Sequence, residues 1–145
     1  MKPTTRLMAL VLFGIVTVEF GGWSLLGLLT GRGSLTPFQE QYFRAGHGHA
    51  GVLLILALVF LLLAERSKYS DSGQFRLSLI LLVGILFQSG GFFVHMLVGD
   101  TGASSVGTTL TSVGAVLLAV ALIGLGVGLL RNVAPDAGAE TKRSD

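Results

Sequence analysis

The chain has 145 residues, of which 51% are hydrophobic and only 12% are charged, and its mean hydropathy is +0.75. A soluble domain carries about a quarter charged residues, so this composition excludes an ordinary soluble protein and indicates one embedded in a membrane. The formal net charge is +2, and the absence of cysteine excludes disulfides and thiolate metal sites.

Four long apolar segments follow one another along the chain. They cover residues 7–29, 45–64, 77–98 and 106–130. Each is about 20 residues or longer, as a helix with a ~1.5 Å rise needs to cross ~30 Å of hydrocarbon. Helices satisfy every backbone polar group in lipid, and the alternating pattern of barrel strands is absent. The sequence therefore predicts an all-α integral membrane four-helix bundle, formed by residues 1–131.

Basic residues are distributed unevenly between the two predicted sides of the membrane. Arg32 and Arg44 lie on one side, and the other eight Lys and Arg residues lie in the N-terminal segment, the middle loop and the tail. Because positive loops stay in the cytoplasm, we expect antiparallel up-down topology with both termini cytoplasmic. The polar residues 132–145 are predicted to form a disordered cytoplasmic tail. The bilayer is thus the expected partner, and nucleic acid is not.

The first predicted external loop contains a helix start of its own. Thr36 is a good N-cap, and Pro37 suits the first helical position. Phe38 and Tyr42 then lie one turn apart. We expect a short interfacial helix ahead of the second span, acting either as an aromatic anchor or as a lid over a site.

All three histidines fall at the predicted external face. His47 and His49 open the second span, and His95 lies near the end of the third. Ionisable groups at membrane depth are costly and usually mark function. Imidazoles bind zinc, copper or iron, and a carboxylate can complete the set, so His47, His49, His95 and Glu19 are candidate metal ligands. A haem would take His49 and His95, one from each of two helices.

His47 and His49 are two residues apart, which in a helix turns their side chains about 200° from each other. Both face the bundle interior only if the helix begins after Gly48 or if Gly46 and Gly48 loosen its backbone. Otherwise we expect His49 to face inward with His95 and His47 to face outward.

Glu19 lies close to the middle of the first span, and Gln88 lies at a similar depth in the third. An ionised carboxylate facing lipid would cost several kcal/mol, so we expect Glu19 to point into the bundle, either protonated or paired with a cation. Glu19 and Gln88 are candidates for a proton relay.

Small and hydroxylated residues are the remaining polar features of the spans. We expect Thr108, Thr109, Thr111 and Ser112 to hydrogen-bond back to carbonyls of their own helix. Gly21, Gly22, Gly90, Gly91 and the glycines at 124, 126 and 128 allow helix backbones to approach closely, and packing within one chain is favoured over a dimer face.

The stretch Phe43-Arg44-Ala45-Gly46-His47-Gly48-His49-Ala50 resembles an Arg-Ala-Gly-His-x-His-Ala motif that opens the second helix of a family of uncharacterised small four-helix bacterial membrane proteins. The resemblance implies a bacterial inner-membrane location and no assigned activity. The placement of Glu19 is similar to that of a proton-exchanging glutamate in small multidrug-resistance transporters, although the surrounding residues differ.

Three functional hypotheses follow from the sequence. The leading one is a metal or haem site near the external face, with copper, zinc or iron as the candidate metals. The second is a proton-coupled small transporter or channel subunit that uses Glu19. The third is a non-catalytic accessory subunit of a larger membrane complex, and the glycine faces leave a homo-oligomer open as well.

Overall fold

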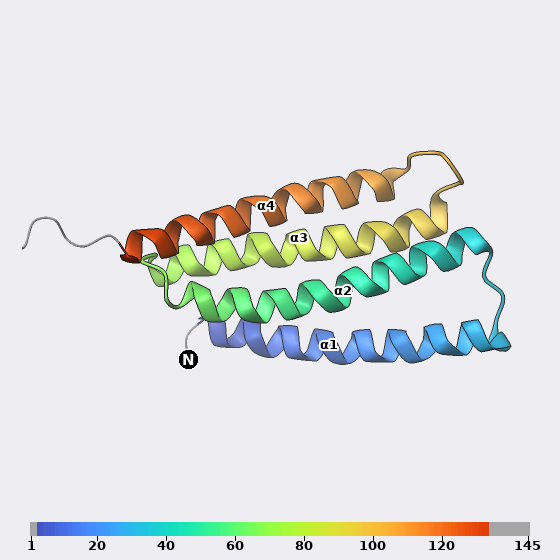
Figure 1. Ribbon diagram of the computed structural model, residues 1–145, viewed down its shortest axis with the longest axis horizontal. Helices are drawn as coiled ribbons and strands as arrows, with labels where there is room; N and C mark the ends of the chain where they lie inside the picture. Colours follow the sequence, from blue (N-terminus) through green and yellow to red (C-terminus); the bar gives the residue numbers. More distant parts are fainter. Residues whose placement is uncertain (1–2, 134–145) are drawn as a thin grey trace, which may run out of the picture.

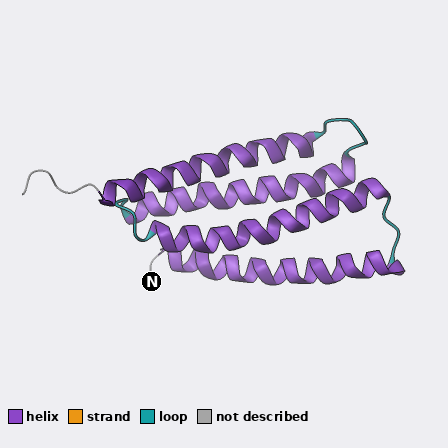
Figure 2. Ribbon diagram, viewed as in Figure 1, coloured by secondary structure: helices purple, strands orange, loops and turns teal. Residues whose placement is uncertain are grey.

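The computed structural model describes residues 3–133, and within this range it consists of helices and loops without strands (Figure 2). The elements are α1 (Pro3–Gly27), the π turn η1 (Leu28–Arg32), α2 (Pro37–Ala64), α3 (Asp71–Val98) and α4 (Val106–Val133). Four helices are long and apolar enough to cross a membrane. The all-helical fold class is confirmed, with four helices able to span a membrane as predicted. Residues 134–145 of the predicted tail lie outside the described residues.

The second helix begins two turns earlier than its apolar run. Thr36 Oγ1 accepts a hydrogen bond from the Gln39 N–H, and the Gln39 side chain accepts one from the Thr36 N–H, which is a complete capping box. The predicted N-cap and Pro37 start are confirmed, whereas the separate interfacial helix is wrong. Nothing between Phe38 and Ala45 breaks the backbone, so these residues form the first turns of α2.

The four helices lie side by side in chain order, with α1 at one edge and α4 at the other (Figure 1). Loops 33–36 and 99–105 lie at one end of the bundle, called here the histidine end, and loop 65–70 lies at the opposite end. Among the described residues, α1 makes no close approach to α4. The helices therefore form a layer with two edges.

Helices α3 and α4 pack most closely, because glycines face each other along their contact. A Cβ added at Gly91 would lie 2.6 Å from the carbonyl oxygen of Gly107, and one at Gly107 would collide with the backbone nitrogen of His95. Gly84 and Gly114 repeat this arrangement two turns away. Because glycine has no side chain, the two backbones touch at these positions, as in other membrane helix pairs.

The most buried apolar residues and two hydrogen bonds between elements lie toward the loop 65–70 end of the bundle. Phe60, Leu61 and Leu81 are almost fully buried there. The Tyr69 hydroxyl donates to the carbonyl oxygen of Gly124 at 2.9 Å, and the Thr4 hydroxyl donates to the Glu65 carboxylate at 2.8 Å. These bonds join the loop to α4 and the start of α1 to the end of α2.

Most of the predicted glycine contacts are made within the single chain. Gly21 and Gly22 receive the His47 ring, Gly124 receives Leu77, and Gly128 receives Tyr69. Gly90 and Gly126 face open space. With Gly91, which packs on α4, the preference for packing inside one chain over a glycine dimer face is supported at five of these seven positions.

Candidate functional site

His95 is the most enclosed histidine, with 2% of its surface exposed. Its Nδ1 lies 2.8 Å from the Ser105 hydroxyl, which also accepts the Gly107 N–H at 3.0 Å. The rings of Phe38 and Tyr42 meet the imidazole edge-on, with centroids 5.4 and 4.4 Å away. His95 thus fastens three elements together at the histidine end: α2, α3 and the start of α4.

His49 lies on the surface of α2, and its Nδ1 is 2.8 Å from the carbonyl oxygen of Ala45 in the same helix. Its ring packs on Phe92 at 4.7 Å. His47 is half-buried on another side of α2, where its ring lies against Gly21 and Gly22 of α1. Because α2 is continuous through this region, the two histidines diverge as residues two apart must.

The expected orientation of this pair is therefore wrong. We predicted His49 inside with His95 and His47 outside, but His49 is exposed and His47 is the one packed between helices. The physical reason is that α1 lies at the edge of the layer, so the α2 face that carries His47 is covered by α1. The glycines of α1 leave room for an imidazole there.

The predicted metal site is not assembled in the described part of the chain. Between residues 3 and 133, no group of three or more His, Asp or Glu side chains is placed to hold a metal ion. Two aromatic rings lie between His49 and His95: the His49 ring packs on Phe92, the His95 ring packs on Tyr42, and Phe92 and Tyr42 lie next to each other. Binding of copper, zinc, iron or haem stays a prediction that this geometry does not support.

Glu19 is exposed on α1, contrary to the expectation that it points into the bundle. The span that contains it runs from Thr4 to Arg32, so its midpoint is residue 18 and Glu19 lies within one residue of it. The buried face of α1 is formed instead by Leu7 and Val11, and Gly14 packs on Leu54 of α2. Because α1 packs mainly on α2 and only slightly on α3, it has one buried face, and Glu19 is not on it.

Gln88 lies on the side of α3 that packs against α4. A Cβ at Gly114 of α4 would collide with the Gln88 backbone, and the Gln88 carbonyl accepts the Thr111 hydroxyl at 3.3 Å. Its side-chain Oε1 is buried without a hydrogen-bond partner, as is the hydroxyl of Ser89. No hydrogen bond joins Glu19 to Gln88 within residues 3–133, and the proton relay stays a prediction.

The hydroxyl prediction holds for three of four residues in α4. Thr108 and Thr109 bond to the Ser105 carbonyl and Ser112 to the Thr108 carbonyl. Thr111 differs because it reaches across to α3, where glycine packing brings the Gln88 carbonyl within range. Sequence reasoning also missed Ser105 as the partner of His95; its position just before α4, where hydroxyl caps are common, was the available signal.

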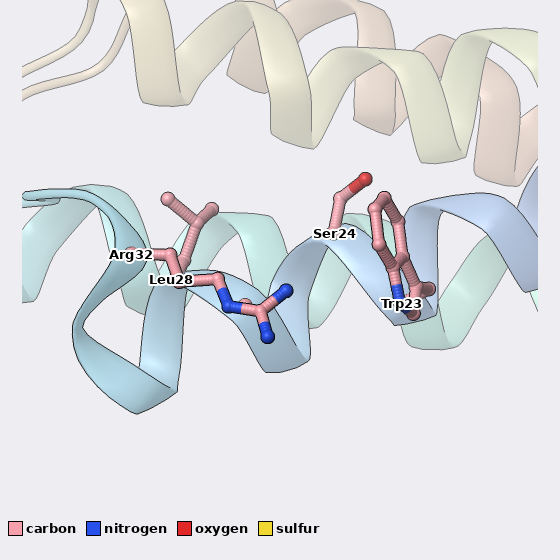
Figure 3. Close-up of a pocket in the computed structure, with 5 residues that line it drawn as sticks. Trp23, Ser24, Leu28 and Arg32 are labelled. Atoms are coloured by element: carbon pink, nitrogen blue, oxygen red, sulfur yellow. The ribbon is translucent and has the colours of Figure 1, made fainter.

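A second feature that the sequence did not reveal lies at the histidine end of α1. Arg32 folds back along the helix, so that its Cδ lies 3.6 Å from where a Cβ on Gly27 would be. Figure 3 shows its guanidinium group turned toward Trp23. A cavity of about 270 Å³ opens there, lined by Trp23, Ser24, Gly27, Leu28 and Arg32.

No protein-family model matches the chain, and no curated protein or solved structure is significantly similar to it. The bacterial four-helix family suggested by the motif around His47 therefore stays a prediction. Function has to be inferred from the chemistry of the chain itself.

Proposed function

We propose that the protein is a subunit of a proton-coupled transporter or channel, and that Glu19 binds and releases the proton where α1 meets a second subunit. The observation that carries this proposal is the exposed carboxyl group at the middle of a membrane span. Left ionised in lipid, it would cost several kcal/mol, and such residues face a protein interior or a water-filled path. The single chain provides neither for Glu19.

The surroundings of Glu19 support an interface on α1. This helix is the least buried of the four spans: only 6% of the residues in its most apolar stretch are buried. Phe13, Val16 and Phe20 are exposed beside the acid. Exposed apolar groups alone suit lipid as well as protein, so it is the acid among them that favours a covering subunit.

The topology that goes with this proposal places both termini in the cytoplasm of a bacterial cell, in the inner membrane. Arg66, Lys68 and Arg76 then lie on the cytoplasmic side with the termini, as the positive-inside rule requires. The histidine end faces the outside. Protons would enter or leave Glu19 from one of these sides through the interface.

A proton-flux assay tests the role of Glu19. The purified protein is reconstituted into vesicles holding a pH-sensitive dye, and a pH gradient is applied. We expect Glu19→Gln to abolish the flux while helix content and elution volume stay unchanged. Glu40→Gln is the matched control, because Glu40 lies outside the apolar run and pairs with Arg44. Equal flux in wild type and Glu19→Gln would contradict the proposal.

Cross-linking tests the interface independently of flux. The chain contains no cysteine, so a single introduced thiol is unique. We expect Val16→Cys on α1 to form a covalent dimer under mild oxidation, and Val116→Cys on the exposed surface of α4 to remain monomeric. A cross-link to a different protein from the native membrane would instead favour the accessory-subunit hypothesis, for which the same exposed α1 face is the supporting observation.

A further inference from the structure

Arg32 differs from the other arginine at the histidine end in how its charge is compensated. Arg44 forms a salt bridge with Glu40 one turn away. Among the residues that the structure describes, no carboxylate forms a salt bridge with Arg32. Its side chain nevertheless runs back along α1 over Gly27, in the direction of Trp23 (Figure 3). An arginine near a span end ordinarily extends its head group to the aqueous side.

The depth of this guanidinium group is that of the lipid head groups. At ~1.5 Å per residue, Gly27 at the end of α1 lies ~13.5 Å from residue 18, the midpoint of the span, and Arg32 follows beyond the η1 turn. The edge of the hydrocarbon lies ~15 Å from the bilayer centre. By folding back over Gly27, the side chain brings its charge to the boundary where lipid phosphates lie.

The groups around the guanidinium match a phosphate ester. Two adjoining hollows, of about 270 and 360 Å³, both border Trp23, Gly27 and Arg32. The planar guanidinium binds phosphate oxygens with two parallel N–H bonds, and the indole N–H of Trp23 is a further donor. Gly27 has no side chain to fill the space between them. Leu26 lines the second hollow and is exposed, so it offers an apolar surface for acyl chains.

We infer that Trp23, Gly27 and Arg32 form a binding site for the phosphate group of a phospholipid, with Arg32 holding the phosphate and the exposed Leu26 contacting the adjoining part of the acyl chains. The wide η1 turn makes this possible, since Gly31 has φ +87° and carries Arg32 around the end of the helix. Trp23 is one turn from Glu19 and Gly27 is two turns from it, and the site does not use Phe13, Val16 or Phe20, which leaves the α1 surface beside Glu19 to a second subunit. It does not depend on proton coupling.

Native mass spectrometry of the detergent-solubilised protein tests this site, with dioleoyl phosphatidylglycerol as the probe. We expect Arg32→Gln to bind the lipid about tenfold more weakly than wild type, because a charged hydrogen-bonding partner is lost. Arg44→Gln is the matched control and keeps wild-type binding, since that charge is already paired. Both arginines are exposed, so neither variant removes a core contact.

Two further probes identify the source of the phosphate. Dioleoylglycerol has the same chains without the phosphate, and equal binding of it by the wild type would overturn the proposal, as would unchanged phosphatidylglycerol binding in Arg32→Gln. Displacement of the lipid by millimolar inorganic phosphate would overturn the assignment to a lipid and give the site to a soluble phosphate. We expect no displacement, because the acyl chains contribute their own contacts.

Discussion

The two edges of the helix layer are built in opposite ways. At the α3–α4 edge, the backbones touch through Gly84, Gly91, Gly107 and Gly114, so a single methyl group has no room. At the α1 edge, one helix rests on α2 and leaves its centre, with Glu19, exposed. The first edge is complete within one chain, whereas the second has an unpaired acid that a single chain cannot accommodate in lipid. The tightest packing and the proposed site of proton binding thus lie at different edges.

The largest expected effect on stability comes from His95, which joins α3 to the start of α4 at the closely packed edge. His95→Ala removes a buried ring together with its bond to Ser105, and we expect a loss of ~2–4 kcal/mol in the free energy of unfolding. His49→Ala, at the exposed position, should change it little. Chemical unfolding in detergent micelles measures both.

The same two variants test the cofactor hypothesis. Metal analysis and an absorption spectrum of the purified proteins give the content of copper, zinc, iron and haem. The present geometry leads us to expect no stoichiometric metal or Soret band in the wild type. A band or metal that both His49→Ala and His95→Ala remove would revive the predicted site.

A smaller effect is expected at the helix contact itself. Gly107→Ala places a methyl group against the backbone of α3, and overpacking of this kind typically costs ~1–3 kcal/mol. Gly126→Ala is the control on the same helix, because nothing lies within 4 Å of its added Cβ. We expect the control to be neutral or slightly stabilising in thermal unfolding. If both variants behaved alike, the close approach of α3 and α4 would be refuted.

The hydrogen bond between Tyr69 and α4, at the α3–α4 edge, should contribute less to the free energy of unfolding. Tyr69→Phe removes the hydroxyl that donates to the Gly124 carbonyl, and the expected loss is ~0.5–1.5 kcal/mol. Tyr42→Phe removes a hydroxyl for which the described residues provide no hydrogen bond, so it should leave the unfolding midpoint in place. A larger loss in Tyr42→Phe would show that its hydroxyl has a partner.

The smallest effect on stability is expected at the α1 edge. A Cβ on Gly22 would lie 3.2 Å from Nε2 of His47, and this ring can shift because it is only half-buried. Replacing glycine in a helix also gains up to ~1 kcal/mol. Gly22→Ala should therefore change the unfolding free energy by less than ~1 kcal/mol. A loss as large as that of Gly107→Ala would mean that α1 is held as tightly as α4.

Local patterns in the sequence were sufficient for the helices. The apolar runs predicted the number and approximate extent of the spans, and Thr36 and Pro37 predicted where α2 begins, because a helix start depends on neighbouring residues alone. The same reasoning failed for the interfacial helix. A short stretch of polar and aromatic residues does not indicate whether a helix is interrupted, and α2 continues without a break through residues 38–45.

Which residues face one another was decided by the tertiary structure. Periodicity places His49 and His47 on different faces of α2, yet only the position of α1 determines which face is covered. The exposure of Glu19, the Thr111 bond to α3 and the return of Arg32 over Gly27 have the same origin. Sequence by itself determined that the chain is a set of membrane-spanning helices, because hydrophobic length is a property of each segment. Which residues of different helices contact each other depends on how the helices pack, and this is decided only in the folded layer.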